Sequence, residues 1–477
     1  MADIERTMAG RETEFEVMRE LLTSNKAELV AIIGRRRIGK TYLVKQVYKD
    51  CLSFHFTGIK EADKNTALNE LYQKFKVLAP AKLVKRPPQS WMEAFRILKA
   101  YLLSIKTKRK KVIFLDEFPW IDSHKSGFLL AFEYFWNDWA VDQNIIVVLC
   151  GSSSSWMIKN VLNNKAGLHN RITKYINLAP FTLKKTKELL SNKNIRMPNY
   201  EITQLYMALG GVPYYLNEVR GSESAIQNID RILFSEKSSL KHEFQNLYRA
   251  LFDNYENYEL IVKALSTKRK GLTREEILNA TPLSNGGGLT RMLKELEESS
   301  FVKSFLPFGK EKKEMLYRLV DEYSVFYFQF HPEKNLAGSF IKLSNSSKYK
   351  SWAGFAFESL CIKHILKLKE ALGISGVFTK ESSYYFKGNK KEAGFQIDLL
   401  IDRNDNAINI CEMKFYGSEY ELPKKEADAL RRRREFFREK SKTRKHLINT
   451  LITTYGFKHT ETSVGIVDKV ITMDKLF

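Results

Sequence analysis

The stretch LVAIIGRRRIGKTYLVKQVY, residues 29–48, decides the fold of the first part of the chain. Its first five residues are apolar and indicate a buried strand, and its last seven have the pattern of a helix. Between them, GRRRIGKT (34–41) fits the spacing GxxxxGK[ST] of a phosphate-binding loop. Glycines let backbone N–H groups approach phosphates, and the N-terminus of the following helix adds a partial positive charge. This strand, loop and helix therefore predict a nucleotide-binding domain.

The polar residues of this loop have predictable roles. Lys40 is expected to reach the β- and γ-phosphates of ATP, and Thr41 is expected to ligate Mg²⁺. ATP and Mg²⁺ are therefore the expected cofactors. A glycine-rich turn without a ligand is the alternative, which the flanking strand and helix disfavour. The expected nucleotide-binding segment consists of Gly34, Arg35, Arg36, Arg37, Ile38, Gly39, Lys40, Thr41 and Tyr42.

Four further apolar runs predict strands that alternate with helices, which indicates a parallel sheet covered on both faces. In VIFLDE (112–117) a strand ends in two acids, at the edge where such a sheet binds its ligand. We expect Asp116 to hold Mg²⁺ through water and Glu117 to orient or deprotonate the attacking water. A chance pair of solvated acids is the alternative. The four runs lie within residues 52–58, 110–122, 145–157 and 174–181.

Two side chains after the strand at 145–151 are candidates for sensing the γ-phosphate. Ser152 opens a run of four serines, so this assignment is open by one residue. Arg171, in the dipeptide NR (170–171), could complete the positive charge around the γ-phosphate from the same chain or from a second copy. A plain surface arginine is an equally compatible interpretation.

The composition indicates a globular protein with an excess of positive charge. The 477 residues suffice for about three domains, and 44% are apolar. Lysine and arginine number 78 against 55 acids, and the net charge of +23 favours a polyanionic partner such as nucleic acid. A merely basic protein is the alternative. No apolar run reaches the roughly 18 residues of a membrane span, no signal peptide is visible, and the four cysteines form no CxxC pair. We therefore expect a cytoplasmic protein without a membrane partner.

The middle of the chain predicts two smaller modules. Residues 182–238 have a helical pattern that is broken by GGVPYYL (210–216). Residues 239–331 predict three helices followed by a β-hairpin, which is the element order of a winged helix. Its basic residues favour contact with the phosphate backbone of DNA, and a plain packing module is the alternative. The serine- and lysine-rich residues 332–351 are expected to form a linker.

Several motifs of this sequence resemble those of a known family. They resemble the archaeal-type ATPase family, from the STAND branch of AAA+ proteins, over about residues 1–330. The resemblance implies an ATP-driven switch, places Gly10 and Arg11 near the adenine, and puts Pro213 in the region that relays the nucleotide state. STAND relatives often assemble, so a homo-oligomer is compatible with it. The motifs that carry it are GRETEFE (10–16), GRRRIGKT (34–41), LDEFPW (115–120), GSS (151–153), NR (170–171) and GGVPYYL (210–216).

A second constellation lies in GFQIDLLIDRNDNAINICEMKFYG (394–417). Apolar residues with period two predict two strands joined by a short turn. Residues two apart on a strand share a face, so Glu412 and Lys414 should point together, with Asp398 on the adjacent strand. Two carboxylates can hold Mg²⁺, and a lysine beside them can activate water or stabilise a pentavalent phosphate.

This pattern resembles the D…(D/E)xK signature of restriction-endonuclease-like nucleases. It looks like the DEXX-box nuclease-like domain (DUF234) that follows the ATPase in this family. The resemblance implies that Glu358 adds a further metal-binding acid. The alternatives are an ordinary hairpin with salt-bridged side chains, and a nuclease fold that only binds DNA. The basic segment 422–445 is expected to offer a phosphate-binding helix face, with a solvated helix surface as its alternative.

Together these expectations give an α/β protein with a P-loop NTPase parallel sheet, a helical lid, a winged helix and a restriction-endonuclease-like α/β domain. The leading hypothesis is a STAND-type ATPase that binds DNA and gates metal-dependent phosphodiester cleavage. The alternative is an ATP-driven regulatory or interaction switch with a catalytically inactive nuclease-like domain. The expected boundaries are 1–181 (ATPase core), 182–238 (lid), 239–331 (winged helix), 332–351 (linker) and 352–477 (nuclease-like domain).

Overall fold

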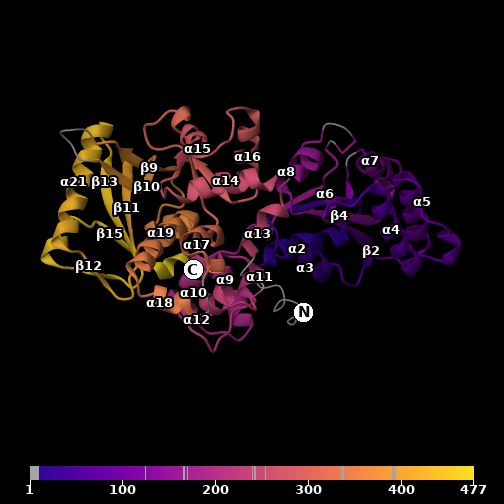
Figure 1. Cartoon of the computed structure of the whole chain (residues 1–477), viewed down its shortest axis with the longest axis horizontal. Helices are drawn as coiled ribbons and strands as arrows, with labels where there is room; N and C mark the ends of the chain where they lie inside the picture. Colours follow the sequence, from indigo (N-terminus) through magenta and orange to yellow (C-terminus); the bar gives the residue numbers. More distant parts are fainter. Residues whose placement is uncertain are drawn as a thin grey trace. The chain divides into compact units, whose positions relative to one another are not determined.

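The chain forms two compact units, which divide between Pro180 and Phe181. Figure 1 shows both, coloured along the sequence. The structure is a computed structural model, and it describes residues 10–123, 125–164, 167–168, 170–238, 240, 243–252, 254–334, 338–388 and 394–477.

The first unit is built on a five-stranded sheet with the order β2-β3-β4-β1-β5. All four pairs of neighbouring strands are parallel. The predicted α/β fold with a parallel central sheet is therefore confirmed, and the carboxyl ends of its strands meet along one edge. The strands are β1 (Glu28–Ile33), β2 (Leu52–Thr57), β3 (Lys111–Asp116), β4 (Ile145–Gly151) and β5 (Lys174–Asn177).

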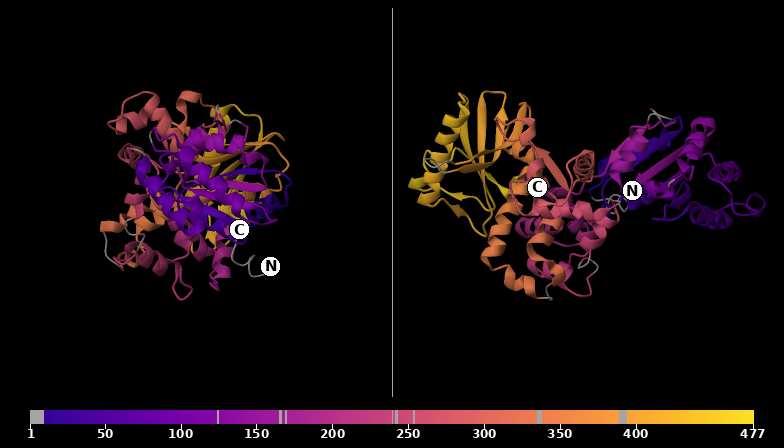
Figure 2. Two further views of the ribbon diagram at one scale, coloured as in Figure 1. Left: turned by 90° about the vertical axis from the view of Figure 1, so that its right-hand side faces the viewer. Right: turned by 45° about the horizontal axis from the view of Figure 1, so that its top comes forward.

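Helices cover both faces of this sheet (Figures 1 and 2). Strand β1 is buried at all six positions, and its side chains alternate between two cores. Leu29 and Ala31 face one core, whereas Val30 and Ile32 face the other. Burial on both faces explains the continuous apolar run in the sequence. The helices are α2 (Glu12–Glu20), α3 (Lys40–Val47), α4 (Lys64–Leu78), α5 (Trp91–Ser104), α6 (Phe118–Ile121), α7 (Phe128–Asp138) and α8 (Ser154–Met157).

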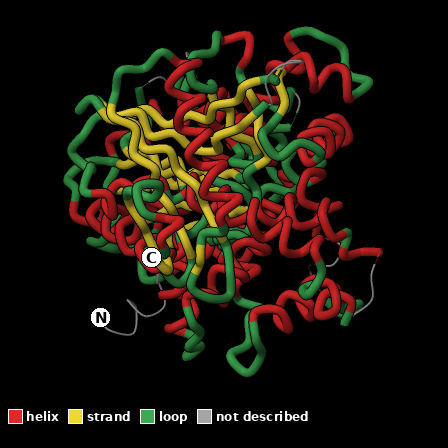
Figure 3. The backbone as a smooth tube through the Cα atoms, turned by 90° about the vertical axis from the view of Figure 1, so that its left-hand side faces the viewer, coloured by secondary structure: helices red, strands yellow, loops and turns green. Residues whose placement is uncertain are grey.

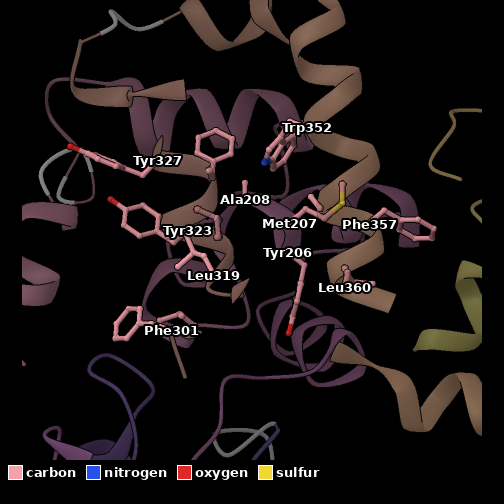
Figure 4. Close-up of a cluster of buried hydrophobic side chains, with 14 of the residues drawn as sticks. Tyr206, Met207, Ala208, Phe301, Leu319, Tyr323, Tyr327, Trp352, Phe357 and Leu360 are labelled. Carbon is pink, nitrogen blue, oxygen red and sulfur yellow. The ribbon is translucent and has the colours of Figure 1, made fainter. Parts of the chain in front are cut away.

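The second unit contains a helical layer with a large apolar core. Side chains of α10, α17 and α19 meet in this core, where Tyr206, Tyr323 and Trp352 are all buried (Figure 4). The helices are α9 (Leu183–Asn192), α10 (Asn199–Leu209), α11 (Pro213–Leu216), α12 (Ala225–Ile229), α13 (Glu243–Arg249), α17 (Glu322–Phe330), α18 (Ser339–Leu343), α19 (Ser347–Lys363) and α20 (Ile365–Leu372).

Between α13 and α17 the chain forms a small subdomain with three helices and a three-stranded sheet. The strand order is β6-β8-β7, and both pairs of strands are antiparallel. A capping box at Thr273 and Glu276 begins the second of these helices. Its elements are α14 (Tyr255–Ser266), β6 (Leu272–Thr273), α15 (Arg274–Ala280), α16 (Gly287–Glu298), β7 (Val302–Phe305) and β8 (Leu316–Leu319).

The C-terminal part of the second unit holds a mixed five-stranded sheet with the order β15-β13-β11-β10-β9. Strands β9, β10 and β11 are antiparallel neighbours, whereas β11, β13 and β15 run parallel. Figure 3 shows these strands side by side in yellow. The elements are β9 (Thr379–Phe386), β10 (Phe395–Arg403), β11 (Ala407–Lys414), β12 (Tyr420–Glu421), α21 (Lys424–Ser441), β13 (His446–Thr453), β14 (Phe457–Lys458) and β15 (Lys469–Thr472).

Two long helices lie on opposite faces of this mixed sheet. Phe437 of α21 packs against Leu400 and Ile410 on one face. Phe357 of α19 belongs to the core that takes up Cys411 on the other face. The sheet is therefore the middle layer of a three-layer arrangement, in which α19 and α21 each bury one face.

The segment expected to be a linker is partly helical. It contains α18 and the beginning of α19. Phe340 and Tyr349 are buried in the core of the second unit, so apolar packing outweighs the local richness in serine and lysine. The described part of 332–351 is therefore helical and packed over much of its length, and its role as a linker stays a prediction; residues 335–337 lie outside the described residues.

Two simpler expectations can be checked directly. All four cysteines are free, and Cys150, Cys361 and Cys411 are buried, as the apolar sequence around them predicts. Over the described ranges of the chain, no helix has the length and apolar character needed to cross a membrane.

Candidate functional site

The loop after β1 has a backbone that only glycine fits at two positions. Gly34 has φ +146°, and a Cβ atom there would lie 2.4 Å from the carbonyl oxygen of Leu178. Gly39 has φ +91° and directly precedes α3, in the left-handed region that other residues rarely adopt. The loop therefore packs closely against the segment after β5 and delivers the N-terminus of α3 to the carboxyl edge of the sheet.

Lys40 lies at the centre of this loop. Its side chain is 5% exposed. Its Nζ donates hydrogen bonds to the carbonyl oxygens of Gly34 (2.8 Å) and Arg35 (3.1 Å) and to Oγ of Ser152 (3.1 Å). The ammonium group is thus fixed between the loop and the end of β4, where the predicted γ-phosphate sensor begins.

Thr41 and Asp116 meet at the predicted Mg²⁺ position. Oγ1 of Thr41 donates a hydrogen bond to Oδ2 of Asp116 over 2.7 Å. Asp116 is buried, and burial raises the pKa of its carboxyl group, with the hydrogen bond from Thr41 acting in the opposite direction. A hydroxyl and a carboxylate on neighbouring elements are a donor set that Mg²⁺ accepts.

Glu117 and Ser152 form the second pair at this edge. The carboxylate of Glu117 accepts hydrogen bonds from the backbone N–H of Ser152 (3.0 Å) and from its hydroxyl group. Glu117 has φ +44° and ψ +50°, in the left-handed region, where a non-glycine residue is strained. Lys40, Ser152 and Glu117 are therefore linked in one hydrogen-bonded chain, and among the four serines it is Ser152 that makes these contacts.

Arg11 contacts the phosphate-binding loop through its guanidinium group. It is 6% exposed, and its guanidinium donates to the carbonyl oxygens of Ile38 (3.1 Å) and Ala179 (2.8 Å). Burial lowers the pKa of Arg11, and the ion pair with Glu14 counteracts this. These contacts tie the loop to the segment after β5. The expected proximity of Gly10 and Arg11 to the adenine stays a prediction.

The other loop residues differ in accessibility. Ile38 is buried in the core beside the sheet, and Arg35 is also buried. Arg36 and Arg37 are partly exposed, and Tyr42 is 49% exposed. Only part of this predicted binding segment is therefore open to a ligand through its side chains, and the remainder can contribute backbone N–H groups.

Arg171 and Pro213 are not brought to the loop by any described contact. Arg171 is exposed, and within the described residues its guanidinium has no hydrogen-bond or ion-pair partner. Pro213 is the first residue of α11 in the second unit. The neighbouring Gly211 is tightly packed, because Phe181 N–H donates to its carbonyl oxygen over 2.6 Å. The expected roles of both residues toward the nucleotide stay predictions.

The second candidate site lies on the mixed sheet. Strands β10 and β11 are antiparallel, and their pairing begins with Leu399 opposite Cys411, so Asp398 and Glu412 each lie one residue beyond this first pair. Glu412 and Lys414 share the face that carries α21, as the period of two predicts. The hairpin expected from the sequence is thus present, with its acids on adjacent strands.

Basic side chains engage Glu412. Lys414 Nζ lies 3.1 Å from Oε1 of Glu412 and 2.7 Å from Oε2 of Glu426 on α21. Arg433, also on α21, lies 2.5 Å from Oε2 of Glu412. Burial acts to lower the pKa of Lys414, but the two glutamates outweigh it and the pKa is raised. Lys414 is therefore held as a cation. The sequence did not indicate Arg433 and Glu426 individually, because only packing decides which residues of a basic helix turn inward.

Glu358 of α19 completes the electrostatic group. Burial, with a contribution from the charges of Asp398 and Glu412 and against the effect of Arg318, raises the pKa of Glu358 to about 8. Burial likewise raises the pKa of Asp398. The charges of the three predicted carboxylates therefore influence one another's pKa values. Within the described part of the chain, however, no three or more His, Cys, Asp or Glu side chains are arranged to hold a metal ion. As they stand, Glu358, Asp398 and Glu412 do not form a ready metal site.

The first unit can be classified by comparison with a known family. Residues 8–219 match the family described as an ATPase domain predominantly from Archaea. This stretch contains the loop, Asp116, Glu117 and Ser152. Residues 8–219 therefore form an ATPase domain of the archaeal type, which supports ATP binding, and this part of the prediction is confirmed.

Individual relatives are more distant. The chain is 25% identical over 411 residues to the uncharacterized protein MJECL04 of Methanocaldococcus jannaschii, covering 85% of this chain and 87% of that protein. It is similar to the solved Walker-type ATPase PABY2304 of Pyrococcus abyssi, at 17% identity and a TM-score of 0.46, covering 68% of this chain and 96% of the other. It is also similar to the ORC2 protein of Aeropyrum pernix, at 14% identity and a TM-score of 0.40, with 68% and 94% covered.

Proposed function

We propose that this protein hydrolyses ATP with Glu117 as the base, while Lys40 and the backbone of residues 34–41 bind the phosphates. The observation that carries this proposal is the hydrogen-bonded chain from Lys40 through Ser152 to Glu117. It connects the group expected to contact the β- and γ-phosphates with the group expected to face the attacking water. The archaeal-type ATPase domain over the same residues supports it.

Each residue at the carboxyl edge of the sheet has a role in this reaction. Lys40 neutralises phosphate charge, and the N-terminus of α3 presents N–H groups to the phosphate oxygens. Thr41 and Asp116 would hold Mg²⁺, which supplies charge neutralisation at the phosphates. Glu117 orients the attacking water and accepts its proton, and Ser152 holds the Glu117 carboxylate in place. Arg171 is exposed and free to approach the γ-phosphate from its own chain or from a second copy.

Replacing Lys40 by methionine tests this proposal. The variant is expected to lose most ATP binding, because a buried ammonium group with three hydrogen bonds is replaced by an apolar chain of similar length. Binding is measured by equilibrium dialysis of labelled ATP, and hydrolysis by release of phosphate. Lys45→Met is the matched control, since Lys45 is exposed on the same helix and should behave like wild type. Undiminished hydrolysis in Lys40→Met would contradict the proposal.

For the second unit we propose DNA binding and metal-dependent phosphodiester cleavage. The element order α14, β6, α15, α16, β7, β8 supports the winged-helix interpretation. The placement of Asp398 and Glu412 on paired strands, with Lys414 on the same face as Glu412, supports the nuclease-like interpretation of residues 352–477. The net charge of +23 supports a nucleic-acid partner bound largely through its phosphates. In this proposal the ATPase switches access to the carboxylates.

One observation favours the alternative function. Glu412 is engaged by both Arg433 and Lys414, which is the pattern of an ordinary salt-bridge network. A nuclease-like domain that has lost cleavage would then act as a DNA-binding or partner-binding module, and ATP hydrolysis would drive a regulatory switch.

Cleavage assays with Glu412→Gln separate the two functions. Single- and double-stranded DNA are incubated with the wild type and Mg²⁺ or Mn²⁺, with and without ATP. The nuclease proposal expects cleavage that falls by at least about 10²-fold in Glu412→Gln, because a metal-ligating carboxylate is lost. Glu421→Gln is the matched control, since Glu421 is exposed and forms a surface ion pair with Lys458. Absence of cleavage under all of these conditions, with ATP hydrolysis intact, would favour the regulatory alternative.

A further inference from the structure

The small subdomain of the second unit is fastened to the mixed sheet by the loop between β7 and β8. We call residues 255–319 the cap. Phe308, in that loop, packs its ring against Phe437 at 5.4 Å and Tyr384 at 6.5 Å between centroids. Its backbone N–H donates a hydrogen bond to the carbonyl oxygen of Ser383 on β9 over 2.8 Å. The loop between β7 and β8 is therefore docked on the mixed sheet and on α21.

Two arginines of the cap lie beside the acid-bearing helix α19. Arg318 on β8 donates a hydrogen bond to Oγ of Ser359, the neighbour of Glu358, over 2.6 Å. Arg269, in the turn before β6, places its guanidinium carbon 3.1 Å from the centre of the Phe355 ring. It also donates to Oγ of Ser351 over 2.9 Å. The cap thus brings two positive charges to the place where the sequence predicts a cation.

The space between the cap and the carboxylates is small. Arg318 and Asp398 line one cavity of about 10 Å³, together with Lys270 and Gln396. A cavity of that size holds about one water molecule. It cannot admit a sugar-phosphate backbone. Asp398 is therefore covered on the cap side by Arg318 and Lys270, and on the α21 side Arg433 and Lys414 already engage Glu412.

The charges of these groups are mutually dependent. Burial lowers the pKa of Arg318, and Glu358 and Asp398 oppose that effect. The same two carboxylates are the ones whose pKa values burial raises. An arginine at this position partly neutralises the carboxylates and repels a divalent cation that approaches them. This explains why the acids are near one another without being arranged around a metal position.

We propose that the cap is an autoinhibitory element, which closes the carboxylate site with Arg318 and is latched to β9 and α21 by Phe308. The inference rests on the function proposed above for Glu358, Asp398 and Glu412. A divalent cation and a phosphodiester backbone gain access only after Phe308 leaves its contacts and Arg318 moves away from α19. Any ligand that binds only the open form shifts the chain toward that form by its differential affinity.

Hydrogen–deuterium exchange of the full-length protein tests the latch without requiring activity. Phe308→Asp is expected to raise the exchange rates of the β9 amides at least tenfold, because the charged side chain cannot remain between Tyr384 and Phe437. Phe378→Asp is the matched control, since the Phe378 side chain is 78% exposed immediately before β9. Millimolar Mn²⁺ should also raise the exchange rates of the β9 amides in the wild type. This second measurement does not depend on the folding of any variant.

Mn²⁺ binding, measured by electron paramagnetic resonance, tests whether the cap closes a metal-binding site. Arg318→Met is expected to bind Mn²⁺ at least about tenfold more tightly than the wild type, and Glu412→Gln in the same background should abolish the gain. Arg274→Met is the control, because among the described residues the hydrogen-bond partners of the Arg274 side chain, Asn285, Gly286 and Thr290, all belong to the cap.

Hydrogen–deuterium exchange tests the latch, and Mn²⁺ binding tests the metal site, so the two parts can be contradicted separately. Unchanged exchange at β9 in Phe308→Asp, and in the wild type with Mn²⁺, would overturn the latch whatever the metal result. Faster exchange in Phe308→Asp, with no Mn²⁺ bound by any variant, would support the latch and overturn the metal site that the proposed nuclease function requires. Faster exchange together with tighter Mn²⁺ binding by Arg318→Met would support both.

Discussion

Replacing Glu117 by glutamine is expected to lower the rate of ATP hydrolysis by about 10²–10⁴-fold, while ATP affinity stays within about twofold of wild type. Glutamine has the shape of glutamate and its amide oxygen can still accept the N–H of Ser152, so the local structure should survive. It cannot accept a proton from the attacking water. Single-turnover hydrolysis and equilibrium binding of labelled ATP separate the two effects.

The control for this variant is Glu61→Gln, because Glu61 is exposed and its carboxylate lies in a surface ion pair with Lys60. It should leave both quantities unchanged. A Glu117→Gln variant that loses binding and hydrolysis to the same degree would assign Glu117 to the structure of the site. A variant that hydrolyses ATP at the wild-type rate would remove Glu117 from the mechanism altogether.

Replacing Gly211 by alanine is expected to lower the free energy of unfolding of the second unit by about 3 kcal/mol. A Cβ atom at this position would lie 1.9 Å from the carbonyl oxygen of Phe181, which is backbone and cannot turn aside. That oxygen also accepts the hydroxyl group of Tyr206 over 2.7 Å, so the clash would disturb a buried hydrogen bond. Urea unfolding followed by tryptophan fluorescence measures the change.

Gly354→Ala is the matched control for this steric argument. A Cβ atom there meets no heavy atom within 4 Å, and the residue lies inside α19. Alanine in a helix interior should therefore leave stability unchanged or raise it by up to about 1 kcal/mol. Equal destabilisation by both substitutions would contradict the role assigned to close packing at Gly211.

The first unit was largely predictable because its signals are local in sequence. The spacing of Gly34, Gly39 and Lys40 specifies the loop, and VIFLDE places Asp116 and Glu117 at the end of a strand. Parallel strands bring such ends to one edge, so their meeting with Ser152 followed from the fold class. The contact of Arg11 with Ile38 and Ala179 did not follow, since it joins segments 27 and 168 residues apart.

In the second unit the local pattern was sufficient for the hairpin but not for its surroundings. Period-two spacing predicts that Glu412 and Lys414 share a face and that Asp398 lies on the adjacent strand. Nothing in the sequence near Arg318 or Phe308 indicates that they reach α19, β9 and α21. The same holds for the helices found at 339–343 and from 347 onward, where Phe340 and Tyr349 find apolar partners that only the tertiary structure supplies.

The latch at Ser383 has a consequence for solubility. Strand β9 is the outermost strand of the mixed sheet, and an uncovered edge strand presents free N–H and C=O groups to other chains. The backbone N–H of Phe308 donates a hydrogen bond to one of these carbonyl groups, that of Ser383. The hairpin loop that carries Phe308 therefore lies against the strand. A molecule with its cap open would therefore expose a pairing edge, and self-association would compete with any proper ligand. Such a protein avoids aggregation when its cap opens only briefly. Each opening then ends with ligand binding or with the return of the loop to β9.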